Sequence, residues 1–381
     1  MSPRISICAS VLALALSSAV QPTSAADRQP VTAQGIASLV QPQAAEPISI
    51  SVYATGLYNP RGLKFGPDGN LYVAEGGRGG THSTASVCPQ VIPPVGPYTG
   101  DRNGGRISRI DRHGVRTTVT TQLPSSQTSA DTGSLVSGVA DIAFIGNTLY
   151  AITAGGGCSH GVLGKPNGVV RILADGTPKL IANLSTYQKT HPVQNAEEED
   201  FEPDGTWYSM IAGREHLYAV EPNHGELVRI STTGAIHRIA DISASQGHIV
   251  PTALTWHAGN FYVGNLNTFP IVEGSAQVLA ISPFGDVRRI ANRLTTILGL
   301  LFDRHDRLYI LQNTTGNAEP TPGAGSIVRI RPNGARETIV SGLSLPTAMT
   351  FGPDGDLFVS NVGFGAPPIG LGQVLRIHLD D

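Results

Sequence analysis

Short stretches of alternating apolar and polar residues recur along the chain from about Ile48 onward, separated by glycine-bearing turns. In the first copy, residues 62–65 and 71–74 flank one such turn, and residues 106–111 and 116–121 flank another. Alternation with a period of two, interrupted by Asp-Gly and related turns, is typical of antiparallel hairpins. No segment shows a sustained helical period. Each copy is therefore predicted to form four short strands.

Two landmarks keep the same order through six copies of this pattern. The first is Leu-Tyr or a close equivalent, at Leu71-Tyr72, Leu149-Tyr150, Leu217-Tyr218, Phe261-Tyr262, Leu308-Tyr309 and Leu357-Phe358. The second is an isoleucine that usually follows arginine, at Ile110, Ile172, Ile230, Ile281, Ile330 and Ile377. A unit of four strands that repeats every 45–50 residues or so is typical of a β-propeller blade. The sequence predicts an all-β fold, a six-bladed β-propeller of four-stranded antiparallel blades.

The sixth copy stops after its third strand, near Ile377, and lacks a fourth. Residues 49–57 resemble the fourth strands predicted at 179–184 and 337–343. We therefore expect the N-terminal strand to complete the last blade, which removes the exposed sheet edge that an open ring would present. The propeller is predicted to span residues 48–381.

The first 25 residues have the features of a secretory signal peptide. Arg4 supplies a positive charge, an apolar run follows, and Thr23-Ser24-Ala25 offers small residues for cleavage. The alternative is a membrane anchor, but the run is short and Gln21-Pro22 follows it directly. We expect signal-peptide residues 1–25, a flexible leader at residues 26–47, and an exported protein, periplasmic or extracellular, without a transmembrane anchor.

Cleavage would leave two of the three cysteines, Cys88 and Cys158. In an oxidising compartment they are expected to form a disulfide, and the alternative is two free thiols. The remaining composition excludes one class of partner. Only 14% of residues are charged, the net charge is −3 and there is no basic run, so nothing indicates binding to nucleic acid.

The long insertions are predicted to share one face of the propeller. They occupy residues 76–103, 155–165, 190–206 and 313–325. If the first strand of each blade lines the channel, the links between the second and third strands and between the fourth strand and the next blade lie on the same face, and the insertions fall in these links. Loops on one side of a rigid scaffold commonly form a binding site. A small-molecule ligand or a partner protein is expected on this loop-rich face, and the chain is expected to be a monomer.

A side-chain oxygen occurs three residues after each aromatic landmark, at Glu75, Thr153, Glu221, Asn265, Gln312 and Asn361. Symmetry would place these oxygens in a ring around one rim of the channel. One interpretation is ordinary polar capping where strands end. The other is a site for Ca²⁺, held by Glu75, Glu221, Asn265 and Asn361, because calcium prefers carboxylate and amide oxygens. Asp141 could add a carboxylate inside the channel.

Three histidines, His160, His224 and His248, lie in predicted loops of the same face. Three imidazoles from different loops could hold Zn²⁺ with an open position for water. The alternative is loop histidines that only satisfy backbone groups. In a metal-dependent enzyme of this kind, Glu221 or Asp141 is the candidate general base.

The resemblance to a known family rests on several longer strings. They are Asn59-Pro60-Arg61-Gly62-Leu63-Lys64-Phe65-Gly66-Pro67-Asp68-Gly69, Phe201-Glu202-Pro203-Asp204-Gly205-Thr206-Trp207-Tyr208, Glu221-Pro222-Asn223-His224-Gly225-Glu226 and Gln246-Gly247-His248-Ile249-Val250-Pro251. With them, nearly all of residues 48–381 resembles the ScyD/ScyE family of exported bacterial proteins, which takes its name from gene clusters for scytonemin, an indole–phenol sunscreen pigment. The family brings no established catalytic residues. More distant similarity to NHL-type and SMP-30-type propellers implies what such a channel can do, since some relatives there use a central metal for lactone hydrolysis or lyase chemistry.

Two functional hypotheses follow. The first is an exported ligand- or partner-binding protein, accessory to the biosynthesis of an exported, scytonemin-like metabolite. It rests on the one-sided loops and on the absence of nucleophile-elbow, zinc-protease, P-loop and dinucleotide motifs. The alternative is a metal-dependent hydrolase or lyase that uses the central channel, because fold alone does not decide function.

Overall fold

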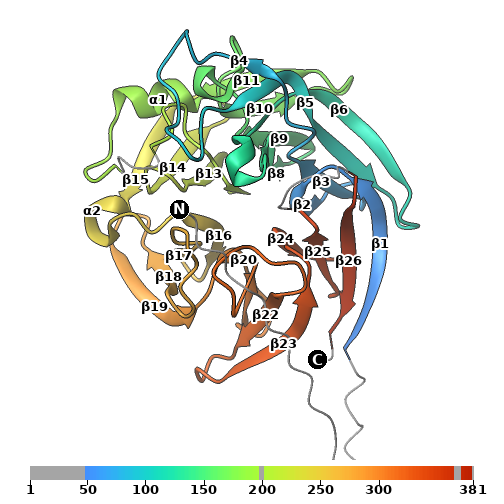
Figure 1. The fold of residues 1–381 in the computed structure, drawn as a ribbon. Helices are drawn as coiled ribbons and strands as arrows, with labels where there is room; N and C mark the ends of the chain where they lie inside the picture. Colours follow the sequence, from blue (N-terminus) through green and yellow to red (C-terminus); the bar gives the residue numbers. More distant parts are fainter. Residues whose placement is uncertain (1–47, 197–200, 364–369, 380–381) are drawn as a thin grey trace, which may run out of the picture. The chain divides into compact units, whose positions relative to one another are not determined.

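A computed structural model describes residues 48–196, 201–363 and 370–379. The predicted signal peptide and leader, residues 1–47, lie outside the described residues. Six sheets follow one another around a ring, and each has four antiparallel strands as its body (Figure 1). The six-bladed β-propeller predicted from the repeat is confirmed.

The blades follow the chain in order, and each blade begins at the channel and ends at the outer edge. Blade 1 contains β2 (Pro60–Phe65), β3 (Leu71–Glu75), β5 (Thr99–Ile110) and β6 (Arg116–Gln127), with the short β4 (His82–Ser83) and β7 (Val136–Ser137) attached. Blade 2 contains β8 (Val139–Ile145), β9 (Thr148–Thr153), β10 (Gly168–Ile172) and β11 (Pro178–Asn183). Blade 3 contains β12 (Ser209–Ala212), β13 (His216–Glu221), β14 (Glu226–Ser231) and β15 (Ile236–Asp241).

The remaining strands repeat this arrangement. Blade 4 contains β16 (Pro251–His257), β17 (Asn260–Asn265), β18 (Ala276–Ile281) and β19 (Val287–Leu294). Blade 5 contains β20 (Ile297–Phe302), β21 (Leu308–Gln312), β22 (Gly325–Ile330) and β23 (Arg336–Leu343). Blade 6 contains β24 (Ala348–Phe351), β25 (Leu357–Asn361), β26 (Gly372–His378) and, from the other end of the chain, β1 (Ser49–Leu57).

The N-terminal strand closes the ring, as predicted. β1 pairs antiparallel with β26, from Ser49 opposite His378 to Leu57 opposite Gly372. Leu57 is fully buried in the core between blades 6 and 1. The strand thereby covers the edge of β26 that would otherwise offer unpaired backbone groups.

Apolar side chains fill the space between neighbouring blades. Between blades 2 and 3, for example, Ile152, Trp207 and Met210 are all completely buried in one cluster. Blades 1 and 2 approach so closely near the channel that a Cβ on Gly62 would lie 1.8 Å from Oδ1 of Asp141. Only glycine fits at that position of β2.

The outer hairpin of blade 1 is longer than the repeat predicts. β5 begins at Thr99 rather than near Arg106, and β6 continues to Gln127. Part of the insertion predicted at residues 76–103 is therefore strand, because the additional residues pair across the hairpin from Thr99 opposite Gln127 onward.

The two cysteines form the expected disulfide. Cys88 lies in the β3–β5 connection and Cys158 begins the short helix η2 (Cys158–His160), and their Cα atoms are 6.3 Å apart. The bond joins loops of blades 1 and 2. The other short helices are η1 (Ala130–Thr132), α1 (Leu184–Thr190) and α2 (Ser243–Gln246). Within the described ranges, none of the helices has the length and apolar character needed to cross a membrane.

Candidate functional site

The long connections lie at one end of the blades, which we call the loop face. It is made of the links between the second and third strands and between the fourth strand and the next blade. It includes the disulfide and η2, together with α1 and α2, which are labelled in Figure 1. The opposite ends of the blades carry short turns. The one-sided arrangement predicted from the insertions is therefore present.

The six predicted rim oxygens are all buried, and most of them share one structural role. Five of them bond the backbone of the connection that leads into their own blade. The bonds are Tyr58 N to Glu75 Oε2 at 2.6 Å, Thr206 N to Glu221 Oε1 at 2.8 Å, Asn265 Nδ2 to Ile249 O at 2.8 Å, Thr295 N to Gln312 Oε1 at 2.7 Å and Ser344 N to Asn361 Oδ1 at 2.9 Å. Thr153 instead bonds Gly168 of the third strand. In five of the six blades the rim residue is therefore a repeated clamp that fixes the start of the blade.

The clamp occupies the oxygens that were candidates for Ca²⁺. Glu75 also accepts hydrogen bonds from Nε of Arg106, at 2.8 Å, and from the Ser108 hydroxyl, while Asn265 Oδ1 accepts from Gln277 N. Among the described residues, no group of three or more His, Cys, Asp or Glu side chains is arranged to hold a metal ion. The calcium site stays a prediction, and these hydrogen bonds favour the capping interpretation.

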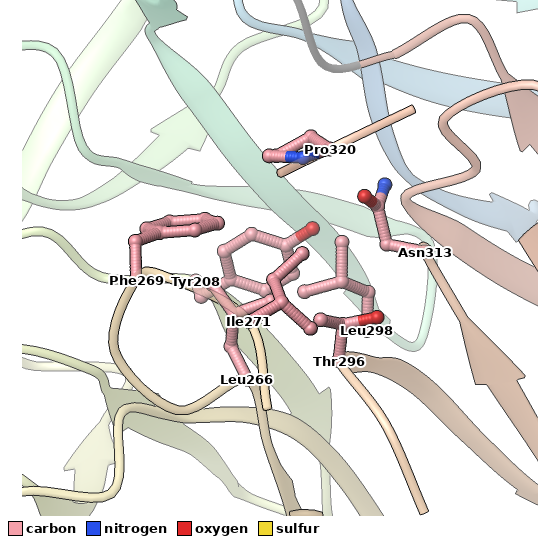
Figure 2. A pocket seen from close by; sticks show the side chains of 8 residues that line it. All are labelled: Tyr208, Leu266, Phe269, Ile271, Thr296, Leu298, Asn313 and Pro320. Atoms are coloured by element: carbon pink, nitrogen blue, oxygen red, sulfur yellow. The ribbon is translucent and has the colours of Figure 1, made fainter. Parts of the chain in front are cut away.

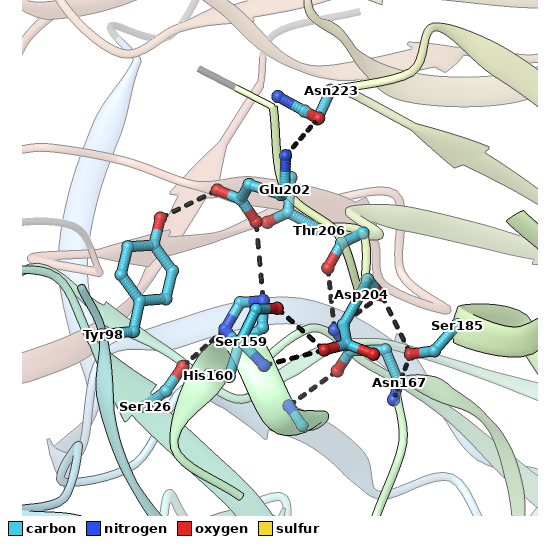
Figure 3. A network of polar contacts seen from close by, with 12 residues as sticks. Tyr98, Ser126, Ser159, His160, Asn167, Ser185, Glu202, Asp204, Thr206 and Asn223 are labelled. Atoms are coloured by element: carbon cyan, nitrogen blue, oxygen red, sulfur yellow. Dashed lines mark hydrogen bonds and ion pairs between the residues drawn. The ribbon is translucent and has the colours of Figure 1, made fainter. Parts of the chain in front are cut away.

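The three histidines have different surroundings. His160 and His224 are buried, whereas His248 is half-buried. His160 Nδ1 is 2.9 Å from the Ser126 hydroxyl, and its Nε2 is 3.5 Å from Glu202 Oε2 (Figure 3). Phe201 lies edge-on to the His224 ring at 5.0 Å, so the chain segment that carries Glu202 runs between the two buried histidines.

His224 forms an ion pair with Glu221. Its Nδ1 is 3.1 Å from Glu221 Oε2, and the same oxygen accepts the backbone N–H of His224 at 2.5 Å. Burial alone would lower the pKa of His224, but the charges of Glu221, Glu226 and Glu202 outweigh burial and raise it. Burial opposes ionisation of Glu221, yet His224 and the N–H of Thr206 lower its pKa below the ordinary value. Glu221 is thus an ionised, fully bonded group.

Asp141 lies in the first strand of blade 2, close to the channel axis. Its Oδ2 accepts from Met210 N at 2.8 Å and from the Ser209 hydroxyl at 3.2 Å, and its Oδ1 accepts from Ile142 N. Burial raises the pKa of this carboxyl, although Lys64 and these hydrogen bonds act in the opposite direction. Asp141 therefore links blade 2 to blade 3 through backbone groups.

Tyr208 crosses the channel at the loop face. Its hydroxyl donates to the carbonyl of Thr347, at the start of blade 6, over 3.1 Å. Burial raises the pKa of Tyr208 to about 12, against the opposing effect of Arg61, so the phenol is neutral. The ring of Tyr208 forms one wall of a small pocket (Figure 2).

That pocket has a volume of about 30 Å³ and an almost wholly apolar lining. Its walls come from the connections of blades 3, 4 and 5 and from the start of β20, and they are formed by Tyr208, Leu266, Phe269, Ile271, Thr296, Leu298, Asn313 and Pro320. Besides Tyr208, two polar side chains line the pocket and both have partners: Asn313 donates to Pro346 O at 2.9 Å, and Thr296 donates to Thr314 O at 2.7 Å. Phe269 is 45% exposed and stands at the rim.

The sequence did not single out the residues that this geometry brings forward, namely Tyr98, Glu202, Tyr208 and Phe269. Glu202 and Tyr208 lie in one of the strings that carry the family resemblance, which gave them no role. Tyr98 bonds Glu202 across 104 positions of sequence at 2.8 Å, so no local spacing reveals the pair.

The fold and the loop face define a six-bladed β-propeller with a small apolar pocket at one end of its channel. No protein-family model matches the sequence, and no curated protein matches it. Among solved structures, the chain is similar to a PQQ-bound aldose sugar dehydrogenase from Streptomyces coelicolor, with 15% identity and a TM-score of 0.54 over 88% of this chain and 99% of the other. It is also similar to a gluconolactonase from Xanthomonas campestris, with 13% identity and a TM-score of 0.52 over 87% of this chain and 89% of the other. At these identities the likeness supports the propeller fold alone.

Proposed function

We propose that the protein is an exported ligand-binding propeller whose loop face receives an apolar part of its ligand at the Tyr208–Phe269 pocket. The observation that carries this proposal is the pocket itself, which is lined by side chains from three blades and has the half-exposed Phe269 in its wall. Ligand sites in proteins are commonly concave, apolar and placed on loops over a rigid scaffold. The resemblance to the ScyD/ScyE family suggests a role as an accessory to the biosynthesis of an exported metabolite.

The size of the pocket limits what enters it. A cavity of about 150 Å³ holds a whole benzene ring, whereas this one measures about 30 Å³. It therefore fits a methyl group or the edge of a ring, while the rest of the ligand lies against Phe269 and the loops around it. Because the polar side chains of the lining are already bonded, a neutral group is favoured over a charged one, which would lose its hydration without compensation.

The alternative, a metal-dependent hydrolase or lyase, has one specific support in the buried histidine–carboxylate pairs under the loop face. Against it, the candidate bases Glu221 and Asp141 both use their oxygens on backbone N–H groups. A general base needs a lone pair within reach of the substrate proton. The binding hypothesis therefore comes first.

The test uses neutral aromatic fragments, indole and 4-methylphenol, with binding detected by saturation-transfer NMR and quantified by calorimetry. We expect Phe269→Ala to weaken binding about fivefold or more, which corresponds to about 1 kcal/mol. The matched control is Phe284→Ala, because Phe284 is 93% exposed in the turn at the opposite end of β18. Equal effects of the two substitutions, or no binding of either fragment, would contradict the proposal.

A further inference from the structure

Two buried polar atoms face each other below the loop face without a hydrogen bond. They are Nε2 of His160 and Oε2 of Glu202, and neither has a hydrogen-bond partner among the described residues. His160 is completely buried and Glu202 is 8% exposed. Their separation is 3.5 Å, beyond the 2.7–3.2 Å or so of an N–H···O hydrogen bond. Such a pair needs a physical explanation, because buried polar groups are costly when they lack a partner.

The other polar atom of each side chain is firmly held. The Ser126 hydroxyl is 2.9 Å from His160 Nδ1, and the hydroxyl of Tyr98 donates to Glu202 Oε1 at 2.8 Å (Figure 3). The Tyr98 ring also packs edge-on against the imidazole, with the ring centroids 4.8 Å apart. These contacts orient both side chains and leave Nε2 and Oε2 directed at each other. Outer hydrogen bonds of this kind are what position the ligands of a metal ion.

We propose that His160 Nε2 and Glu202 Oε2 are two ligands of one divalent transition-metal ion, of which Zn²⁺ is the representative. Histidine nitrogen and carboxylate oxygen bind zinc at about 2.0–2.2 Å, so two such ligands on a tetrahedral ion stand about 3.3–3.6 Å apart. The observed 3.5 Å agrees with that separation. With a metal on Nε2, the proton of the imidazole resides on Nδ1 and is donated to Ser126.

The surrounding charge is suited to a cation. Glu221 and Glu226 lie in the same buried region, and their charges, with that of Glu202, all act on His224. His224, which pairs with Glu221 at 3.1 Å, and Arg238, which pairs with Glu226 at 2.6 Å, partly offset this negative charge. No third His, Cys, Asp or Glu of the described residues joins the pair, so the remaining coordination positions fall to water. The site goes beyond the proposed ligand binding and does not depend on it.

The experiment measures zinc uptake by the full mature chain, purified without a His-tag and stripped with chelator. Equilibrium dialysis against ZnCl₂ near pH 7.5, where an ordinary histidine is neutral, is read by mass spectrometry of metal content. Co²⁺ substitution provides a spectroscopic readout of the ligand geometry. We expect one equivalent of zinc, and a tetrahedral Co²⁺ absorption that disappears in Glu202→Gln and His160→Gln. Ser126→Ala should weaken uptake about tenfold, as outer-shell changes do.

Matched substitutions make the outcome decisive. His257→Gln alters a histidine at the opposite end of the blades that makes an ordinary 3.1 Å pair with Asp306, so its zinc uptake should equal that of the unmodified protein. Glu202→Gln keeps the size of the side chain and the hydrogen bond from Tyr98. If His160→Gln fails to fold, the test rests on Glu202→Gln, whose fold is verified by circular dichroism. Absence of saturable zinc uptake, or uptake that survives Glu202→Gln, overturns the proposal.

Discussion

Replacing Glu75 tests whether the ring of rim oxygens is a structural clamp. The Glu75 carboxylate is completely buried and receives Arg106 Nε at 2.8 Å, Arg106 Nη2 at 2.6 Å and Tyr58 N at 2.6 Å. Arg106 is itself only 5% exposed, and its guanidinium lies 3.7 Å from the centre of the Tyr58 ring. Glu75→Ala would therefore leave a buried arginine without its counter-charge and an N–H of the closing connection without its acceptor.

The magnitude follows from the burial of the pair. Removing one partner of a buried ion pair destabilises a protein by about 3–5 kcal/mol, because the other charge stays uncompensated. The comparison is Glu337→Ala in β23, the outer strand of blade 5, which breaks the ion pairs of Glu337 with Arg329 and Arg331. Those side chains are partly exposed to solvent, so this substitution should cost about 0–1 kcal/mol.

The assay is equilibrium unfolding in urea, followed by circular dichroism on the disulfide-bonded protein. The same curves are recorded in excess Ca²⁺ and in excess chelator. A structural clamp predicts the large loss for Glu75→Ala in both solutions. The reasoning is refuted if Glu75→Ala costs no more than Glu337→Ala, and a loss seen only in the presence of Ca²⁺ would instead assign Glu75 to a calcium site.

Three further outcomes follow from the same structure. Leu57→Ala in β1 should lower the free energy of unfolding by about 2–5 kcal/mol. Val52→Ala, on the exposed side of the same strand, should change it by less than about 0.5 kcal/mol. Equal effects of the two substitutions would argue against closure of the ring by β1. Reduction of Cys88–Cys158 should add the mass of two hydrogens and, for a separation of 70 residues, lower the unfolding free energy by about 4 kcal/mol in the chain-entropy model. For His224, whose pKa is raised in the folded state, the stabilisation is complete below the unfolded pKa of about 6.5 and is lost as pH rises through the folded value. The stability difference between the unmodified protein and His224→Gln should accordingly shrink with rising pH in urea titrations, and a difference that grows would contradict the ion pair.

The propeller could be predicted because its determinants are local. Alternation along each strand and a turn such as Asp68-Gly69, where glycine adopts a φ of 74°, repeat in every blade. The missing fourth strand of the last copy was equally visible, since residues 49–57 carry the pattern that the copy lacks. These signals are properties of neighbouring residues and need no knowledge of long-range contacts.

The candidate site could be predicted only in part. The position of each rim oxygen follows from the repeat, but for five of the six the partner is a backbone group upstream. The same residue types serve a clamp or a cation equally well. Tyr98, His160 and Glu202 come from three connections that meet only after blades 1, 2 and 3 have packed side by side. The disulfide between Cys88 and Cys158 could be predicted because only these two cysteines remain after the expected cleavage of the signal peptide.

The structure separates side chains that hold the loop face together from side chains that are free to meet a ligand. Glu221 and the rim amides bond backbone groups of their own connections, and Asp141 bonds the backbone of blade 3. Changing these residues is therefore expected to alter unfolding first and binding only as a consequence. Phe269 is half-exposed and lines the pocket, so its truncation should change binding while the unfolding free energy stays nearly constant. The ratio of the effect on binding to the effect on stability therefore distinguishes the two classes. If Glu221→Gln abolished binding of a neutral fragment without altering unfolding, that division would be wrong, and Glu221 would belong to the ligand site itself.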